Sequence, residues 1–172
     1  MTSDRTYIIV LSGAVLWCAL ILVAPVFVIF GGIPGLVGDM LFRFFHCICH
    51  QLDERSLHIL GKPLAVCARC SSIYAGFLAA TILFPFVRGL AHSILSRRAV
   101  LLWSLVPMLA DVALDALGVH GSTTFTRLIT GALFGVVVPF FIIPAAQEAM
   151  RDLMTRPQSF QHDELKKGTV HA

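Results

Sequence analysis

Four long apolar runs constrain what this chain of 172 residues can fold into more than any other feature. They cover about residues 7–30, 64–87, 99–119 and 126–146, and each is close to the ~20 residues with which a helix crosses the apolar core of a bilayer. Hydrophobic residues make up 57% of the chain and charged residues only 13%, against about 25% charged in an average soluble domain. Lipid offers no hydrogen-bond partner to an open backbone, so each run should be helical. The sequence therefore predicts an all-α, polytopic integral membrane protein with about four transmembrane helices.

The segments around these runs suggest how the chain is organised. We expect residues 1–150 to form a single transmembrane helical domain and residues 151–172 to form a polar tail. The first run is long and has no small-residue cleavage site, which favours a membrane anchor over a signal peptide. Residues 31–63 should form a loop that contains cysteine and histidine and begins with a glycine-rich turn.

Lys and Arg are distributed unevenly between the two sides of the predicted spans. Eight fall on the side of the termini and three on the side of the first loop. The eight are Arg5, Arg88, Arg97, Arg98, Arg151, Arg156, Lys166 and Lys167, and the three are Arg43, Arg55 and Lys62. Because positive side chains favour the cytoplasm, we expect a multi-pass protein of the cell inner (cytoplasmic) membrane with both termini and the tail in the cytoplasm. The net charge of +3 then reflects topology, and we expect no nucleic acid partner.

Cysteine and histidine gather at the face that this orientation makes extracytoplasmic. Cys67 and Cys70, at the start of the second run, are three residues apart, a spacing that places both sulfurs on one face of a helix. Such a pair serves as half of a tetrahedral zinc site or as a dithiol that cycles with a disulfide. The loop offers further ligands, of which Cys49 and His50 complete a set of three sulfurs and one nitrogen that suits zinc. His46 and Cys47 are alternative ligands from the same stretch.

Two carboxylates lie inside the third apolar run. Asp111 and Asp115 are four residues apart, and a carboxylate in a membrane span costs about 3 kcal/mol on insertion scales, so it needs a partner or a role. Arg127, near the start of the fourth run, is the partner we expect for Asp111, because the turn between the two runs is short. The group is either a structural ion pair or part of a catalytic site. We take Asp111, Asp115, Arg127 and Arg69 as candidate catalytic residues.

Small residues in the fourth run indicate packing rather than chemistry. Gly131 and Gly135 form a small-xxx-small pair that lets another helix approach closely. Ser122, Thr123 and Thr124 are suited to cap the helix that follows them.

The motifs CHQLDERS, CARC with IYAGF, and STTFTRLITG, with Pro107 and Asp111 between them, resemble a bacterial and archaeal family of membrane proteins catalogued as domain of unknown function 2085. The resemblance covers about residues 45–135. The matching positions are Cys49, His50, Gln51, Arg55, Ser56, Cys67, Arg69, Cys70, Tyr74, Gly76, Asp111, Ser122, Thr123, Arg127 and Gly131. The resemblance implies that these polar residues belong to one site. The chain departs from the family pattern at Ser71-Ser72, Val112, Asp115 and Thr124, and Cys47 is an addition.

These residues are compatible with three functions. The first is a membrane protein with a zinc site beside the Asp/Arg cluster, which becomes an enzyme if water holds one zinc position. Its substrate at the membrane surface would be a lipid head group, with Arg69 and Arg127 as phosphate partners.

The second function is a quinone-linked thiol–disulfide oxidoreductase, because a four-helix membrane protein with Cys-x-x-Cys at the outer mouth of a span resembles the disulfide-generating proteins of bacteria. Cys47 or Cys49 would then exchange with Cys67 or Cys70. The third is an accessory subunit of a larger membrane complex, in which the metal is a structural staple. The expected partners are the lipid bilayer and, beyond it, a lipid or other membrane subunits.

Overall fold

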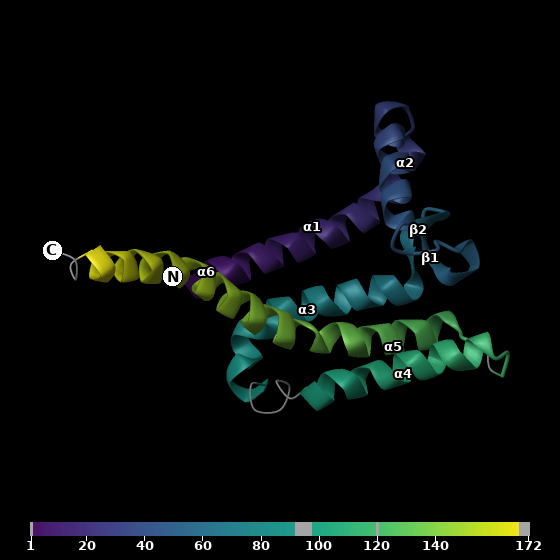
Figure 1. Ribbon diagram of the computed structural model, residues 1–172. Helices are drawn as coiled ribbons and strands as arrows, with labels where there is room; N and C mark the ends of the chain where they lie inside the picture. Colours follow the sequence, from purple (N-terminus) through teal and green to yellow (C-terminus); the bar gives the residue numbers. More distant parts are fainter. Residues whose placement is uncertain (1, 92–97, 120, 169–172) are drawn as a thin grey trace.

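The computed structural model describes residues 2–91, 98–119 and 121–168. The elements in chain order are α1 (Thr2–Phe30), α2 (Gly32–His46), the 3-10 helix η1 (Asp53–Arg55), β1 (Ser56–Ile59), β2 (Lys62–Cys67), α3 (Ala68–Ala91), α4 (Arg98–Ala116), α5 (Thr124–Val137) and α6 (Pro139–Gly168). Helices α3, α4 and α5 lie side by side and α1 runs along α3. The β1–β2 hairpin lies at the end of the bundle where α3 begins, and α2 stands steeply away from the end of α1 beside it (Figure 1). We call this end of the bundle the hairpin end.

Four segments of the described chain are long and apolar enough to cross a membrane, which confirms the expected fold class. They are Asp4–Phe30, Ala68–Val87, Ala99–Ala116 and Thr124–Leu153. Many large apolar side chains point outward, among them Trp103 at 72% and Phe86 at 85% exposure. Such exposure is costly in water but natural in lipid, since lipid tails are as apolar as these side chains. The chain is therefore a helical membrane protein.

The ends of the third and fourth runs differ from the expected positions. The helix of the third run, α4, ends at Ala116 instead of 119, because Gly118 adopts φ +67 and donates to the Asp115 carbonyl at 3.2 Å. Val119 donates to the Leu114 carbonyl at 3.1 Å, which completes a Schellman stop. The fourth run, expected over 126–146, is divided between α5 and α6. Its break falls where Pro139 lacks an N–H for the helical ladder and opens the new helix.

The second run begins as a strand. We expected a helix from residue 64, but residues 62–67 form β2, which pairs antiparallel with β1, and the helix begins at Ala68. The hairpin turn consists of Leu60 and Gly61, both at positive φ (52° and 76°), as the tight turns of hairpins require. Leu64, Ala65 and Val66 are buried against α1 and the end of α2. This packing fixes the position of Cys67, the last residue of β2, directly before α3.

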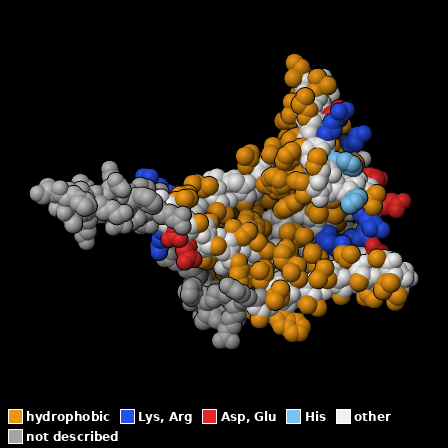
Figure 2. Space-filling model, in the orientation of Figure 1, with side chains coloured by type: hydrophobic (Ala, Val, Ile, Leu, Met, Phe, Trp, Pro, Cys, Tyr) orange, Lys and Arg blue, Asp and Glu red, His pale blue; other side chains and the backbone are white. Residues whose placement is uncertain are grey.

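Helix α2 occupies part of what the sequence indicated as loop. The chain leaves α1 through Gly31 and Gly32, both at positive φ, and α2 then runs steeply away from the axis of α1 (Figure 1). Gly38 lets α2 touch α1, because a Cβ there would lie 2.9 Å from the Ala24 carbonyl oxygen. Helix α2 also carries a row of exposed apolar side chains, of which Phe44 packs edge-on against Trp17 of α1. The row consists of Ile33, Leu36, Val37, Met40 and Phe44. Apolar side chains gather on the bundle side of α2 and cations on the other side (Figure 2), a pattern typical of helices that lie in a membrane interface.

The closest helix packing is between α3 and α5, and it confirms the expected role of the two glycines. A Cβ on Gly131 would lie 2.6 Å from the Arg69 carbonyl oxygen, and one on Gly135 would lie 2.9 Å from the Ile73 Cα. From the opposite side, a Cβ on Gly76 would lie 3.0 Å from the Ala132 carbonyl oxygen. The glycines therefore hold α5 against the part of α3 that carries Arg69.

We predict that Gly135→Ala lowers the stability of the purified protein in detergent by about 1–3 kcal/mol, because backbone atoms of α3 would have to move. Gly13→Ala is the matched control, since a Cβ on Gly13 in α1 meets nothing within 4 Å. Thermal unfolding followed by circular dichroism measures both variants. Equal midpoints for the two would show that the α3–α5 approach is not needed for stability.

Candidate metal centre and polar cluster

Three cysteines from three segments meet at the hairpin end. Cys49 follows α2, Cys67 ends β2, and Cys70 lies in the first turn of α3. Their sulfur atoms all lie within 4.8 Å of one another. We call these three residues the cysteine cluster. The sequence placed Cys67 and Cys70 on one helix face; in the structure a strand-to-helix junction brings the two sulfurs together instead.

The loop that carries Cys49 is held in place by backbone contacts. The Cys49 amide donates to the Phe45 carbonyl at 2.9 Å, and the Cys67 amide donates to the Cys49 sulfur at 3.2 Å. Gln51, at φ 49, donates through Nε2 to the carbonyls of Phe42 (2.8 Å) and Ala65 (2.7 Å), which ties the loop to both α2 and β2. Residue chemistry alone did not identify Gln51 as functional; its place in the family pattern was the available signal.

The thiolate form of Cys67 is favoured by its surroundings. A hydrogen bond from the Cys70 thiol lowers the pKa of Cys67 to about 5, and this effect outweighs the burial that opposes it. A thiolate is the form of cysteine that binds metals and attacks disulfides. The cluster is therefore chemically competent at neutral pH for either role.

The three sulfurs are close enough together to hold a metal ion. Tetrahedral zinc–sulfur bonds of about 2.3 Å separate two sulfurs by about 3.8 Å, and the sulfurs of the cluster lie within 4.8 Å of one another. His50 is exposed and is not part of the group of ligand atoms that lie within 4.8 Å of one another. It does line the same cavity as the three cysteines. Three protein sulfurs leave one position of a tetrahedral metal to His50, water or a substrate.

The charged residues form a second group next to the cysteine cluster. Asp111 forms an ion pair with Arg69 and accepts a hydrogen bond from Ser122 Oγ at 3.0 Å. Arg127 Nε donates to the same Ser122 oxygen at 2.9 Å. Asp115 lies 3.4 Å from Arg55 and 3.5 Å from Arg127.

The expected pairing of Asp111 with Arg127 is therefore wrong. Arg69 of α3 forms the ion pair with Asp111. Arg127 lies beside Asp115, and Asp115 is one helical turn after Asp111 in α4. Ser122 connects the two pairs, and its amide donates to Asp115 Oδ1 at 3.0 Å. The expected helix cap is confirmed at Thr123, whose side chain accepts from the Thr126 amide at 3.2 Å.

One cavity of about 340 Å³ joins the two groups. Its lining includes the cysteine cluster, His50 and Gln51, together with Arg55, Arg69 and Arg127. We call it the arginine cavity. Asp111 and Asp115 do not line it; they hold the arginines that do. Charged and histidine side chains crowd this end of the molecule, in contrast to the apolar flank of the bundle (Figure 2).

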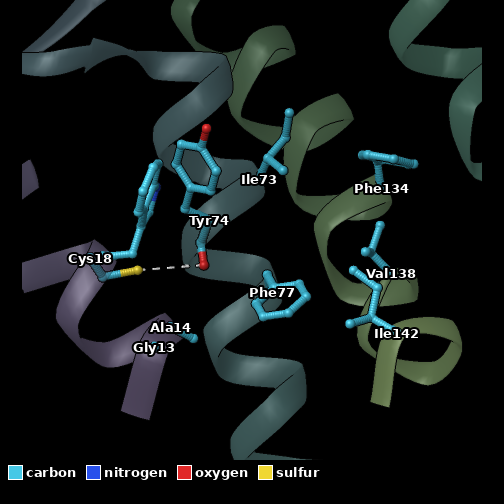
Figure 3. Close-up of a pocket in the computed structure, with 10 residues that line it drawn as sticks. Gly13, Ala14, Cys18, Ile73, Tyr74, Phe77, Phe134, Val138 and Ile142 are labelled. Carbon is cyan, nitrogen blue, oxygen red and sulfur yellow. Dashed lines mark hydrogen bonds between the residues drawn. The ribbon is translucent and has the colours of Figure 1, made fainter. Parts of the chain in front are cut away.

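The remaining cysteines lie away from the cluster. Cys47 is exposed, and Cys18 lies in α1 with its sulfur 3.6 Å from the Tyr74 carbonyl oxygen. Cys18 and Tyr74 border an apolar cavity of about 370 Å³ between α1, α3 and the α5–α6 junction (Figure 3). A second apolar cavity, of about 520 Å³, also includes Cys18 and Tyr74 in its lining.

Comparisons with known proteins agree with the membrane fold. A family model described as a predicted membrane protein (DUF2085) matches residues 49–141. An uncharacterised protein of the archaeon Methanocaldococcus jannaschii is 34% identical to this chain over 143 residues, which cover 81% of this chain and 92% of the relative. No solved structure matches the chain.

Proposed function

This chain belongs to the DUF2085 family of predicted membrane proteins, and on that premise we propose that it is a zinc-dependent enzyme that acts at the membrane surface. One observation carries the proposal: three cysteine sulfurs and three arginines line the same cavity at the hairpin end. Arginine side chains are suited to bind phosphate and carboxylate groups, so three of them beside the cysteine cluster favour a site for a negatively charged substrate.

We assign Cys49, Cys67 and Cys70 as the permanent zinc ligands, with His50 at the mouth of the site. A zinc ion held by these three cysteines would activate a water molecule for attack on a substrate. Arg55, Arg69 and Arg127, which line the same cavity, would bind and orient a negatively charged group. Asp111 and Asp115 act as positioning residues, since each holds one or two of the arginines by an ion pair.

Replacement of His50 distinguishes an enzyme site from a closed structural site. We predict that His50→Ala keeps bound zinc, because the three sulfurs remain in place. His58→Ala is the control, since His58 is also exposed but pairs with Asp53 at 3.1 Å. Zinc content per chain is measured by elemental analysis after dialysis. If His50→Ala loses zinc while His58→Ala keeps it, His50 closes the site and the enzyme proposal fails.

We propose that the hairpin end faces outward from the cytoplasm and that both termini lie inside. The uneven distribution of Lys and Arg supports this orientation, and four spans return the chain to its starting side. We predict that alkaline phosphatase fused after Ala172 is inactive, whereas the same enzyme inserted at the exposed Gly61 of the hairpin turn is active in whole cells. The reverse pattern would place the cavity in the cytoplasm.

Thiol–disulfide exchange is the second candidate function. The lowered pKa of Cys67 and the exposed Cys47, two residues from Cys49, favour it. The apolar cavities beside Tyr74 offer space for a quinone in the span region (Figure 3). This function requires that Cys67 or Cys70 form a disulfide during turnover, so alkylation and mass spectrometry of protein from growing cells separates it from the zinc enzyme.

A further inference from the structure

We propose that the arginine cavity binds a phosphate group, which makes a phosphate ester the substrate class of the proposed enzyme. This inference rests on the proposed function for its catalytic meaning, but the binding of phosphate can be tested separately from zinc. The ligand chemistry is the phosphate itself, carried by a lipid head group or free in solution.

Three guanidinium groups from three elements converge on the cavity. Arg55 comes from η1, Arg69 from the first turn of α3, and Arg127 from the first turn of α5. Their side chains are 48%, 19% and 8% exposed, so Arg55 lies toward the mouth and Arg127 toward the bottom. A planar guanidinium matches the oxygens of a phosphate with two parallel hydrogen bonds, which an ammonium group cannot do. A cavity of about 340 Å³ has room for a phosphate and the group it esterifies.

One arginine of the cavity has a hydrogen-bond donor that the described residues leave unused. Arg69 Nε is buried and has no hydrogen-bond partner among the described residues. A buried donor left without an acceptor is costly, and such groups mark places where a ligand or water is bound. An oxygen of a bound phosphate would supply an acceptor for Arg69 Nε, while Nη2 of the same side chain stays paired with Asp111.

The charges at the cavity also leave room for an anion. Asp111 compensates Arg69, but Asp115 is shared between Arg55 and Arg127. The described ion pairs therefore set two carboxylates against three arginines. A zinc ion bound by three thiolates has a net charge of −1. A competing role for the third arginine is therefore to neutralise the charge of the metal centre.

The position of the cavity favours a lipid as the source of the phosphate. Ile48 and Leu52, which line the cavity, are about half exposed, and α2 next to them carries its apolar row along the same end of the bundle. A helix with such a row lies at the boundary between head groups and acyl chains. The arginines are then at the depth of the phosphates.

Binding by the full-length protein, purified in detergent without added metal, tests the proposal. The probes are inorganic phosphate, dihexanoyl phosphatidic acid and, as the uncharged control, dihexanoyl glycerol, each titrated calorimetrically. Arg55→Gln is the main variant because Arg55 is half exposed and can be replaced without leaving a buried cavity. Arg55→Lys keeps the charge but loses the planar fork, and Lys62→Gln removes an exposed cation of the hairpin that does not line the cavity.

We expect phosphatidic acid to bind, and Arg55→Gln to weaken its binding about tenfold, as expected for the loss of a charge-assisted hydrogen bond. Arg55→Lys should lose less, and Lys62→Gln should bind as the unmodified protein does. Binding of both phosphate and phosphatidic acid, with the same dependence on Arg55, supports recognition of free phosphate as well. Binding of phosphatidic acid alone supports a lipid source.

Three results would overturn the phosphate site: no binding of either phosphate probe, equal binding of dihexanoyl glycerol and phosphatidic acid, or equal effects of Arg55→Gln and Lys62→Gln. The arginines would then serve to balance the metal centre. Zinc content is measured on the same samples. Phosphate binding by a protein that contains no zinc would contradict the zinc enzyme and support the phosphate site. Bound zinc without phosphate binding would support the zinc site and contradict the phosphate site.

Discussion

Under the proposed zinc site, Cys49→Ser should abolish zinc binding and markedly destabilise the hairpin end. Cys49 is 6% exposed and packs in the core with Phe45, Leu64 and Val66, so its sulfur would link the proposed metal to the contact between α2 and β2. In zinc-binding peptides the metal contributes about 10–16 kcal/mol to the free energy of folding at neutral pH. The stability lost with the zinc should therefore exceed the loss from any single packing change in the chain. Elemental analysis and the thermal midpoint measure the two effects.

Cys47→Ser is the matched control for this prediction. Cys47 is two residues away, exposed, and outside the cysteine cluster, so the variant should keep both zinc and stability. Equal zinc contents in Cys49→Ser and Cys47→Ser would remove Cys49 from the ligand set. The alternative thiol function would predict a different pattern, in which Cys47→Ser also changes the disulfide content.

Asp111→Asn should be the most damaging single change in the polar cluster. The Asp111 side chain is 8% exposed and its partner Arg69 is 19% exposed, so removal of the carboxylate leaves a largely buried positive charge. A buried pair broken on one side costs about 3–5 kcal/mol, and the partial exposure of Arg69 places the expected loss near ~3 kcal/mol. Denaturation of the detergent-solubilised protein measures it.

The double variants test which arginine belongs to Asp111. Asp111→Asn with Arg69→Gln should recover part of the lost stability, because both charges of one pair are then gone. Asp111→Asn with Arg127→Gln should not recover it, because that combination breaks two different pairs. Recovery in the second double variant and not in the first would restore the pairing expected from the sequence.

The fold class could be predicted from the sequence because membrane spans follow from length and hydropathy alone. The hairpin could not, since Leu64, Ala65 and Val66 continue directly into the apolar run of α3, and a short apolar run does not distinguish strand from helix. The available signal was the Leu60-Gly61 turn. Helix α2 was missed because its polar neighbours and leading glycines indicated a loop.

Most residues of the site could be predicted from the sequence, but the pairs that they form could not. Cys49, Cys67 and Cys70 were expected to meet, and the structure brings their sulfurs together; His50 lies apart from them at the cavity. The partner of Asp111 was missed because Arg69 lies 42 residues away in the chain. Which arginine reaches which carboxylate depends on how α3 and α5 pack. Gly131 and Gly135 determine that packing through their contacts with α3, and the sequence does not show which part of α3 they contact.

Elemental analysis of the unmodified protein, purified without added metal, tests the central proposal most directly. The proposal predicts about one zinc per chain, a content that is lost in Cys49→Ser and kept in Cys47→Ser, with Cys67 and Cys70 both resistant to alkylation until a chelator removes the metal. A metal-free protein that contains a reducible disulfide among Cys49, Cys67 and Cys70 would contradict the zinc enzyme and identify the cysteine cluster as a thiol–disulfide centre.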